Sequence, residues 1–336
     1  MALGKRAKQE QNPIWIEAAS IPRSPGHPFY ERLNAVLAEE RFDEHCESVC
    51  AKFYAEKRGR PSIPPGVYFR MLMIGYFEGI DSERGIAWRA KDSLGLRAFL
   101  GYPLTQDTPD HSSLSRTRTR IDAETHEEIF TWALELLKRK GFVKGKTLAV
   151  DATTLEANAA MRSIVRRDTG ESYQAFLEKL ARESGVETPT REDLARFDKN
   201  RDKKTSNDEW TNPHDPDAKI TKMKDGRTHL AHKAEHGVDL DTGAVLAVTV
   251  QGANQGDTTT IRQTTEVAIE NLGSLQGSQD CVEELVADKG YHSNAVLADM
   301  TAIGIRTYIS EPKGPRRNWK GRERERRAVN GNRRRI

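Results

Sequence analysis

The segment KTLAVDATTLEANA, residues 146–159, begins with a short apolar run that ends in an acid, Asp151. A second short run, EELVAD at residues 283–288, also ends in an acid, Asp288. Apolar runs of this length are typical of buried strands. The sequence therefore predicts two core strands, each followed at once by a carboxylate.

Around these two runs the sequence predicts a mixed sheet. Two apolar stretches flank the turn signal DLDTG at residues 239–243, a pattern that is typical of a β-hairpin. In chain order, we expect hairpin strands at 229–238 and 244–250, a helix at 257–272 capped by Asp257, a helix at 294–302 and a last strand at 305–309. The order strand, hairpin, helix, strand, helix, strand is that of a ribonuclease H-like fold.

A polar and charged insertion at about residues 155–228 interrupts this pattern. It holds one expected helix, at residues 173–184, and we expect it to cover the exit of the first strand rather than to form a core of its own. The mixed α/β domain that carries the insertion spans residues 141–311.

The first part of the chain has the spacing of helices. Apolar residues recur at helical intervals within residues 29–57, and residues 67–80 predict a helix that is apolar on most sides. We expect an all-α domain at residues 29–140, after a flexible leader at residues 1–28. The predicted fold class is α+β, an all-α domain followed by the ribonuclease H-like domain.

A helix expected at residues 109–121, with Thr108 as its cap, carries hydroxyl and guanidinium groups along its length. Such groups suit phosphates and base edges, and the region resembles a helix-turn-helix unit. A charged helix surface is also compatible with a merely solvated face. The candidate DNA-binding residues are Ser112, Ser113, Ser115, Arg116, Arg118 and Arg120.

The formal net charge of +3 conceals an asymmetry. Residues 312–336 hold 11 Lys and Arg against 2 Glu, so the rest of the chain is net negative. A basic tail of this kind attracts phosphate backbones, although it can also be only solvated. No apolar run reaches the roughly 18 residues of a membrane span, and three cysteines cannot form a disulfide framework. We therefore expect a cytoplasmic protein with no membrane partner.

The two strand-end acids point to metal chemistry. If the two strands lie side by side and parallel, the carboxylates of Asp151 and Asp288 project from the same end of the sheet. Paired carboxylates there can hold divalent ions that activate a water and stabilise a leaving oxygen, and Mg²⁺ prefers such hard oxygen ligands. Taken singly, an aspartate after a strand is also compatible with a turn residue.

Three motifs resemble those of bacterial insertion-sequence transposases of the DDE type: PDHSSLSRTR at 109–118, VDATTLEANA at 150–159 and VADKGYHS at 286–293. The resemblance covers nearly the whole chain. It implies that Asp151 and Asp288 are the first two acids of a triad that binds Mg²⁺ or Mn²⁺. It also implies nicking of double-stranded DNA at terminal inverted repeats and transfer to target DNA, in a homodimer or larger synaptic complex associated with the nucleoid.

The resemblance extends to residues around the acids. Lys289 and His292 follow the second acid and are candidates for contact with phosphates, a packing or capping role being the alternative. Residues 215–227 look like another family segment, in which Lys219, Lys222 and Lys224 are candidate backbone contacts.

The third acid of the family, a glutamate on a helix after the last strand that is typically followed by an ERxFAH-like segment, is not found. Glu323 and Glu325 are weak candidates because the surrounding GRERERR has no apolar stripe to dock a helix on the sheet. We therefore expect a basic tail at residues 312–336 and a truncated transposase. The alternatives are a catalytically inactive DNA-binding repressor of transposition and a ribonuclease H-like nuclease.

Overall fold

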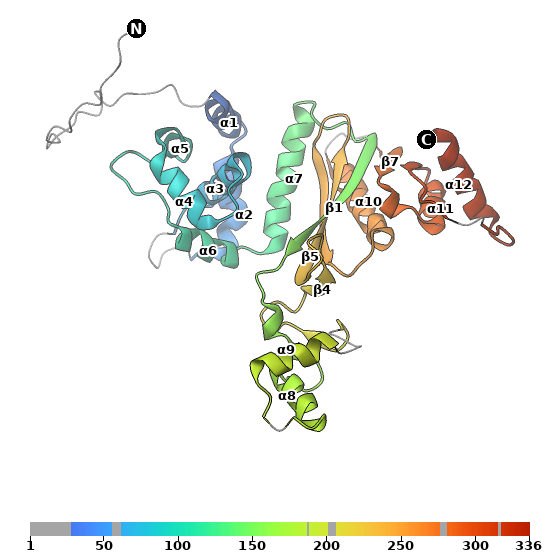
Figure 1. Cartoon of the computed structure of the whole chain (residues 1–336). Helices are drawn as coiled ribbons and strands as arrows, with labels where there is room; N and C mark the ends of the chain where they lie inside the picture. The colour runs from blue at the N-terminus through green and yellow to red at the C-terminus, as the bar shows by residue number, and fades with distance from the viewer. Residues whose placement is uncertain (1–27, 56–61, 187, 201–205, 276–280, 315–316) are drawn as a thin grey trace, which may run out of the picture. The chain divides into compact units, whose positions relative to one another are not determined.

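The computed structural model (Figure 1) describes residues 28–55, 62–186, 188–200, 206–275, 281–314 and 317–336. The predicted leader lies outside the described residues except for Pro28. The chain divides into two compact units, Met1–Phe130 and Thr131–Ile336, which we call the helical unit and the sheet unit. None of the described helices is both long and apolar enough to cross a membrane.

The helical unit confirms the predicted all-α character of the first part of the chain. Its helices are α1 (Pro28–Glu39), α2 (Phe42–Cys50), α3 (Pro65–Glu78), α4 (Glu83–Asp92), α5 (Leu94–Phe99) and α6 (His111–Arg120), with a 3₁₀ turn η2 (Ala51–Phe53). Helix α7 (Ala123–Arg139) runs across the division between the units. Helix α3 supplies Tyr68, Met71 and Ile74 to the core, whereas Tyr76 at its end is exposed. The prediction for α3 thus holds for its first three turns.

The sheet unit is built on a six-stranded sheet in the order β4-β5-β1-β7-β8, with β6 also paired to β5. The strands are β1 (Thr147–Glu156), β4 (Lys219–Lys222), β5 (Thr228–Asp239), β6 (Val245–Gly252), β7 (Glu284–Ala287) and β8 (Arg306–Ile309). Strand β5 is antiparallel to β1, β4 and β6, whereas β7 runs parallel to β1 and β8. The predicted hairpin and ribonuclease H-like order are confirmed, and β4 is an additional strand.

Three helices belong to this sheet: α10 (Asp257–Ser274), α11 (Asn294–Ala302) and α12 (Glu323–Arg335). Helix α10 packs on β6, β5 and β1, and α11 and α12 pack on β8 and on each other. A 3₁₀ turn, η4 (Lys289–Tyr291), links β7 to α11. The turn brings the chain from the end of a core strand to the start of a helix within a few residues.

The insertion is more ordered than its polar sequence predicts. It contains η3 (Met161–Ser163), the short strands β2 (Val165–Arg166) and β3 (Trp210–Thr211), and two helices, α8 (Tyr173–Glu183) and α9 (Arg191–Asn200). Trp210 is buried together with Ile164 and Leu230, so the expectation of one helix without a core is wrong. Few apolar residues suffice here because Tyr173 and Phe176 of α8 pack edge-on against the large Trp210 ring.

The basic segment after β8 is also not a solvated tail. Residues 323–335 form α12, which buries Ala328, Val329 and Asn332. The side chain of Asn332 accepts from the Ile309 N–H at 3.1 Å and donates to the Ile309 carbonyl at 2.8 Å. The sequence prediction that this segment cannot dock is wrong because one amide satisfies the backbone of edge strand β8, so only two apolar residues are needed.

We expect Asn332→Ala to lower the free energy of unfolding by about 3 kcal/mol, because it leaves a buried N–H and a buried C=O of Ile309 without partners. Urea unfolding followed by circular dichroism measures this change. Asn330→Ala on the same helix is the control and should change stability by less than about 0.5 kcal/mol. Equal losses in the two variants would show that the Asn332 amide does not hold α12 on β8.

Candidate active site

The register of β1 and β7 determines where the two strand-end aspartates lie. Val150 pairs in parallel with Ala287, so Asp151 and Asp288, the next residue of each chain segment, occupy neighbouring positions where β7 ends beside β1. Neighbouring strands are about 4.8 Å apart. Both aspartates are exposed. The predicted closeness of the two acids is thus present in the backbone, but the prediction that the first strand ends at Asp151 is wrong. Strand β1 continues to Glu156 because its polar second half stays paired with β5.

Each of the two carboxylates makes only local contacts. One oxygen of Asp151 accepts from the adjacent Ala152 N–H at 2.8 Å, and Asp288 Oδ1 accepts from the Gly290 N–H at 2.7 Å. Neither aspartate has a cationic partner within 4.0 Å among the residues that the structure describes. Both therefore keep oxygen lone pairs directed to solvent, where they are available to an ion or a ligand.

A third carboxylate approaches this edge from α10. A Cβ atom on Gly290 would lie 2.7 Å from Asp257 Oδ2 and 2.9 Å from Asp288 Oδ1. The carboxylates of both acids therefore lie next to this glycine. A side chain at position 290 would therefore displace one of these two carboxylates. Asp257 is the first residue of α10 rather than its cap, which is Gly256, and its Oδ1 lies 2.7 Å from Lys233 Nζ.

A buried polar network lies between β5 and α10, next to these acids. Lys233 and Glu235 are neighbours on one face of β5, 5% and 0% exposed respectively, and their charged atoms are 3.2 Å apart. Lys233 Nζ also donates to Thr260 at 2.8 Å, and the Thr260 hydroxyl donates to Glu235 at 2.8 Å. Every member is bonded to another, which is the condition under which buried charges are tolerated.

Tyr291 connects this network to the second aspartate. Its hydroxyl donates to Glu235 Oε1 at 3.0 Å, and its backbone closes η4, which begins directly after Asp288. Burial, followed by the nearby charge of Glu235, raises the pKa of Tyr291 well above its ordinary value of 10.0, and Asp257 and Asp151 act in the same direction. The hydroxyl therefore stays a proton donor, and it fixes the turn that presents Asp288.

The residues at this edge fit one divalent ion. Two exposed carboxylates on adjacent strands are the donor set that Mg²⁺ accepts when substrate phosphates and waters complete its shell. Within the described residues, no group of three or more His, Cys, Asp and Glu side chains is placed to hold a metal. Glu323 and Glu325 begin α12, where each contacts an arginine, Arg326 at 3.7 Å and Arg322 at 4.0 Å.

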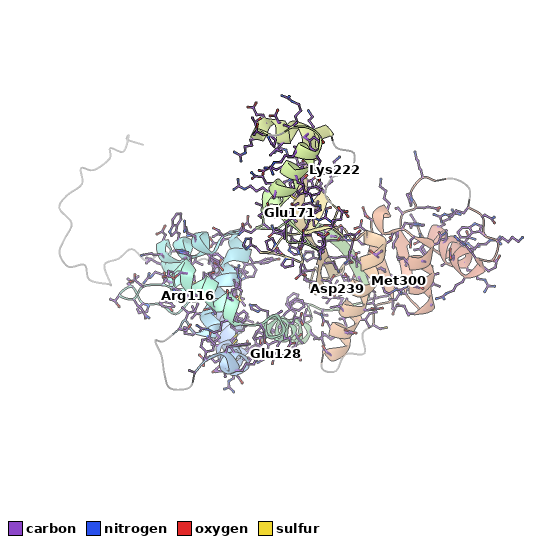
Figure 2. All side chains as sticks on the ribbon, turned by 90° about the horizontal axis from the view of Figure 1, so that it is seen from below. Arg116, Glu128, Glu171, Lys222, Asp239 and Met300 are labelled. Carbon is purple, nitrogen blue, oxygen red and sulfur yellow. The ribbon has the colours of Figure 1, made fainter. Side chains whose placement is uncertain are left out.

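The candidate DNA-binding residues lie on α6 of the helical unit, which is capped by Asp110 and not by Thr108. The Asp110 side chain accepts from the Ser113 N–H at 2.7 Å, so the helix begins two residues later than expected. Ser113, Arg116 and Arg120 lie along one pocket of about 670 Å³, and Figure 2 labels Arg116 on this unit.

The structure separates these α6 residues by their contacts. Arg116 folds back on Ser112 (2.7 Å to its hydroxyl), and Arg118 forms an ion pair with Glu83 at 3.2 Å. Arg120 contacts the Ser62 hydroxyl, and Ser115 is exposed. Arg118 therefore has an acidic partner. Arg116 also donates to the Ser112 carbonyl, and Arg120 lies over the Tyr54 ring, but neither has an acidic partner within 4.0 Å among the described residues.

The candidate DNA-binding residues of the sheet unit differ in exposure and in their contacts. Lys289 and Lys224 are exposed, as is Lys222, which Figure 2 labels, whereas the Lys219 ammonium donates to the Pro216 carbonyl at 3.0 Å. His292 is only 8% exposed, and burial, with the nearby Arg317, lowers its pKa. Its burial favours the packing role that the sequence left open.

Sequence reasoning missed the network of Lys233, Glu235 and Tyr291 and took Asp257 only as a cap. The usable signal was the pair of opposite charges two residues apart in a strand, since such residues share one face of a sheet. The sequence could not indicate that this face is covered by α10.

Comparison with known protein families agrees with this architecture. Residues 19–120 match the family described as Transposase domain (DUF772), and residues 144–335 match the family described as Transposase DDE domain. No curated protein matches the chain. Because the second match covers more than half of the sequence, the chain belongs to the family of DDE transposases.

Proposed function

We propose that this chain catalyses metal-dependent DNA strand cleavage and strand transfer at the terminal inverted repeats of an insertion sequence. The observation that supports this most directly is the register that sets Asp151, within β1, beside Asp288, directly after β7. Family membership supplies the reaction class, phosphoryl transfer on DNA. The residues proposed to act in catalysis are these two aspartates.

The proposed roles follow from the contacts of each side chain. Asp151 and Asp288 would hold Mg²⁺ or Mn²⁺, which when bound neutralises phosphate charge and favours ionisation of a water. Gly290 leaves space between Asp288 and Asp257. Lys233 keeps Asp257 oriented, and Tyr291 holds the turn that carries Asp288.

We infer that the helical domain, residues 29–140, recognises the element ends through α6. Ser112, Ser113, Ser115, Arg116, Arg118 and Arg120 are the proposed contacts to double-stranded DNA. Lys219, Lys222 and Lys289 of the catalytic domain, residues 141–311, would contact the backbone. Joining two ends favours a homodimer or a larger synaptic complex, which the proposal therefore includes.

The test uses the full chain and labelled DNA that carries the element's inverted repeats. We expect nicks at the repeat ends in Mg²⁺ or Mn²⁺ and none after chelation of the metal. Cleavage that persists without metal would contradict the proposal. Specific binding without cleavage in either metal would instead support the repressor, and preferential cleavage of RNA–DNA hybrids would support the nuclease.

The part assigned to α6 makes a separate prediction. Arg116→Gln combined with Arg120→Gln should weaken binding of end DNA about tenfold and reduce the salt slope by about 2, because two phosphate contacts are lost. Fluorescence anisotropy across a KCl series measures both quantities. Arg32→Gln with Lys91→Gln, two exposed cations on α1 and α4, is the control pair. The same loss in both pairs would rule out a specific role for α6.

A further inference from the structure

The segment that precedes α12 forms a pocket of about 470 Å³ in the sheet unit. All its lining residues are cations or amides, and none is acidic: Asn294, Arg317, Asn318, Lys320 and Arg322. The first of these begins α11, and the others lie between β8 and α12. A concave surface with three cations and no carboxylate favours a ligand with several anionic oxygens.

The cations of this pocket are only partly neutralised. The Arg317 guanidinium pairs with Glu311 at 2.8 Å, but its buried Nη1 has no hydrogen-bond partner among the described residues. Arg322 has only a loose contact with Glu325 at 4.0 Å. Within the same described part of the chain, the Lys320 ammonium has no acidic partner within 4.0 Å. Several N–H donors thus remain for a ligand.

The acidic side chain beside the pocket, Glu311, already has two cationic partners. Glu311 receives Arg317 and also Arg333, whose guanidinium donates to both of its oxygens at 2.6 and 2.9 Å. The side-chain oxygen of Asn318 accepts from the backbone N–H of Lys320 at 3.0 Å. The side-chain NH₂ group of Asn318 is therefore left as a donor. The pocket therefore offers donors and positive charge but few acceptors, as expected of a phosphate site and not of a cation site.

One residue that lines the pocket, Asn294, lies close in sequence to the turn that carries the second aspartate. Asn294 follows Asp288 by one short stretch that consists of η4, His292 and the capping residue Ser293. The positive charge of Arg317 also contributes, after burial, to the lowered pKa of His292 in this stretch. Asn294 thus belongs both to the lining of the pocket and to the short stretch of chain that follows Asp288.

We propose that this pocket binds a backbone phosphodiester of the DNA strand that is processed at Asp151 and Asp288. The inference rests on the proposed function. It assigns part of the basic charge of residues 312–336 to one defined site and leaves the rest on the exposed face of α12. Lys320 and Arg322 supply the charge, and Arg317 and the two asparagines supply oriented N–H groups.

The test compares two double variants of the full chain. Lys320→Gln with Arg322→Gln removes two charges from the pocket, and Arg327→Gln with Arg334→Gln removes two from the exposed surface of α12. Fluorescence anisotropy with end DNA over a KCl series gives the affinity and the salt slope. We expect the pocket pair to weaken binding about tenfold and to reduce the slope by about 2, and the α12 pair to stay within about twofold. Thermal unfolding checks that both variants are folded.

A titration with inorganic phosphate tests whether the pocket binds a free phosphate ligand or a phosphodiester of DNA. A thermal-shift titration of the wild type with inorganic phosphate should give weak, millimolar binding that the pocket pair loses. Tight phosphate binding lost in the pocket pair, with unchanged DNA affinity, would assign the pocket to a small ligand and overturn the proposal. Equal DNA losses in the two double variants would overturn it in favour of a diffuse basic surface.

The proposed function and this inference fail in different ways. If the wild type nicks end DNA in metal but the pocket pair binds that DNA as the wild type does, only the pocket assignment fails. If the wild type neither binds nor nicks end DNA, both fail. The Asp288→Asn variant should keep the wild-type salt slope, because the pocket remains intact.

Discussion

Replacing Asp288 by Asn is expected to lower metal-dependent nicking of inverted-repeat DNA by about a thousandfold or more, with the same result for Asp151→Asn. Each change keeps the side-chain shape but removes the negative charge that an ion requires. Losing a ligand to the ion is worth several kcal/mol of transition-state stabilisation, and each 1.4 kcal/mol is a factor of ten in rate. Single-turnover cleavage in Mg²⁺ and in Mn²⁺ measures the loss.

The control for this prediction is Asp241→Asn. Asp241 is exposed in the turn between β5 and β6, which lies beyond the start of β1, whereas the two acids lie after the β1–β7 pairing. Its cleavage rate should stay within about twofold of the wild type. DNA affinity in chelator should be the same for all four proteins. Cleavage by Asp288→Asn at more than about a tenth of the wild-type rate would contradict the assignment.

Lys233→Met should lower the free energy of unfolding by about 3–5 kcal/mol, the largest stability change that we expect from one substitution. Glu235 is fully buried, and removing the ammonium 3.2 Å away leaves its charge uncompensated. The variant also releases Asp257 from its 2.7 Å contact. Urea unfolding followed by circular dichroism measures the change.

Two further variants separate charge from packing in this network. Adding Glu235→Gln to Lys233→Met should recover part of the lost stability, since no unpaired charge remains buried. Lys222→Met makes the same replacement at an exposed position of β4 and should change stability by less than about 0.5 kcal/mol. A loss below about 1 kcal/mol in Lys233→Met, or strictly additive effects in the double variant, would show that the pair is not coupled as the distances imply.

The sequence predicted the two central strands and their acids because the signal is local. In KTLAVD and EELVAD a short apolar run stops at a charged residue, and nothing outside each run is needed to recognise it. The hairpin around Asp239 was predictable for the same reason. The parallel order of β1 and β7 then followed from the sequence of elements along the chain.

The features that the sequence did not predict depend on residues far apart in the chain. Asn332 docks α12 through the backbone of Ile309, 23 residues away, and a polar side chain gives no sign of such a contact. Tyr291 reaches Glu235 across 56 residues, so the strand pattern of β5 could indicate a charged face but not what covers it. In the insertion, Trp210 builds a small core with residues that are spread over about 70 positions.

The most direct test of the central claim is the binding of Mn²⁺, followed by electron paramagnetic resonance of the free ion in the presence of end DNA. We predict that the wild-type chain removes Mn²⁺ from solution at the Asp151 and Asp288 edge, and that Asp288→Asn weakens this binding at least tenfold while its DNA affinity is unchanged. Equal Mn²⁺ binding by the two proteins would contradict the account, because the ion would then be held elsewhere.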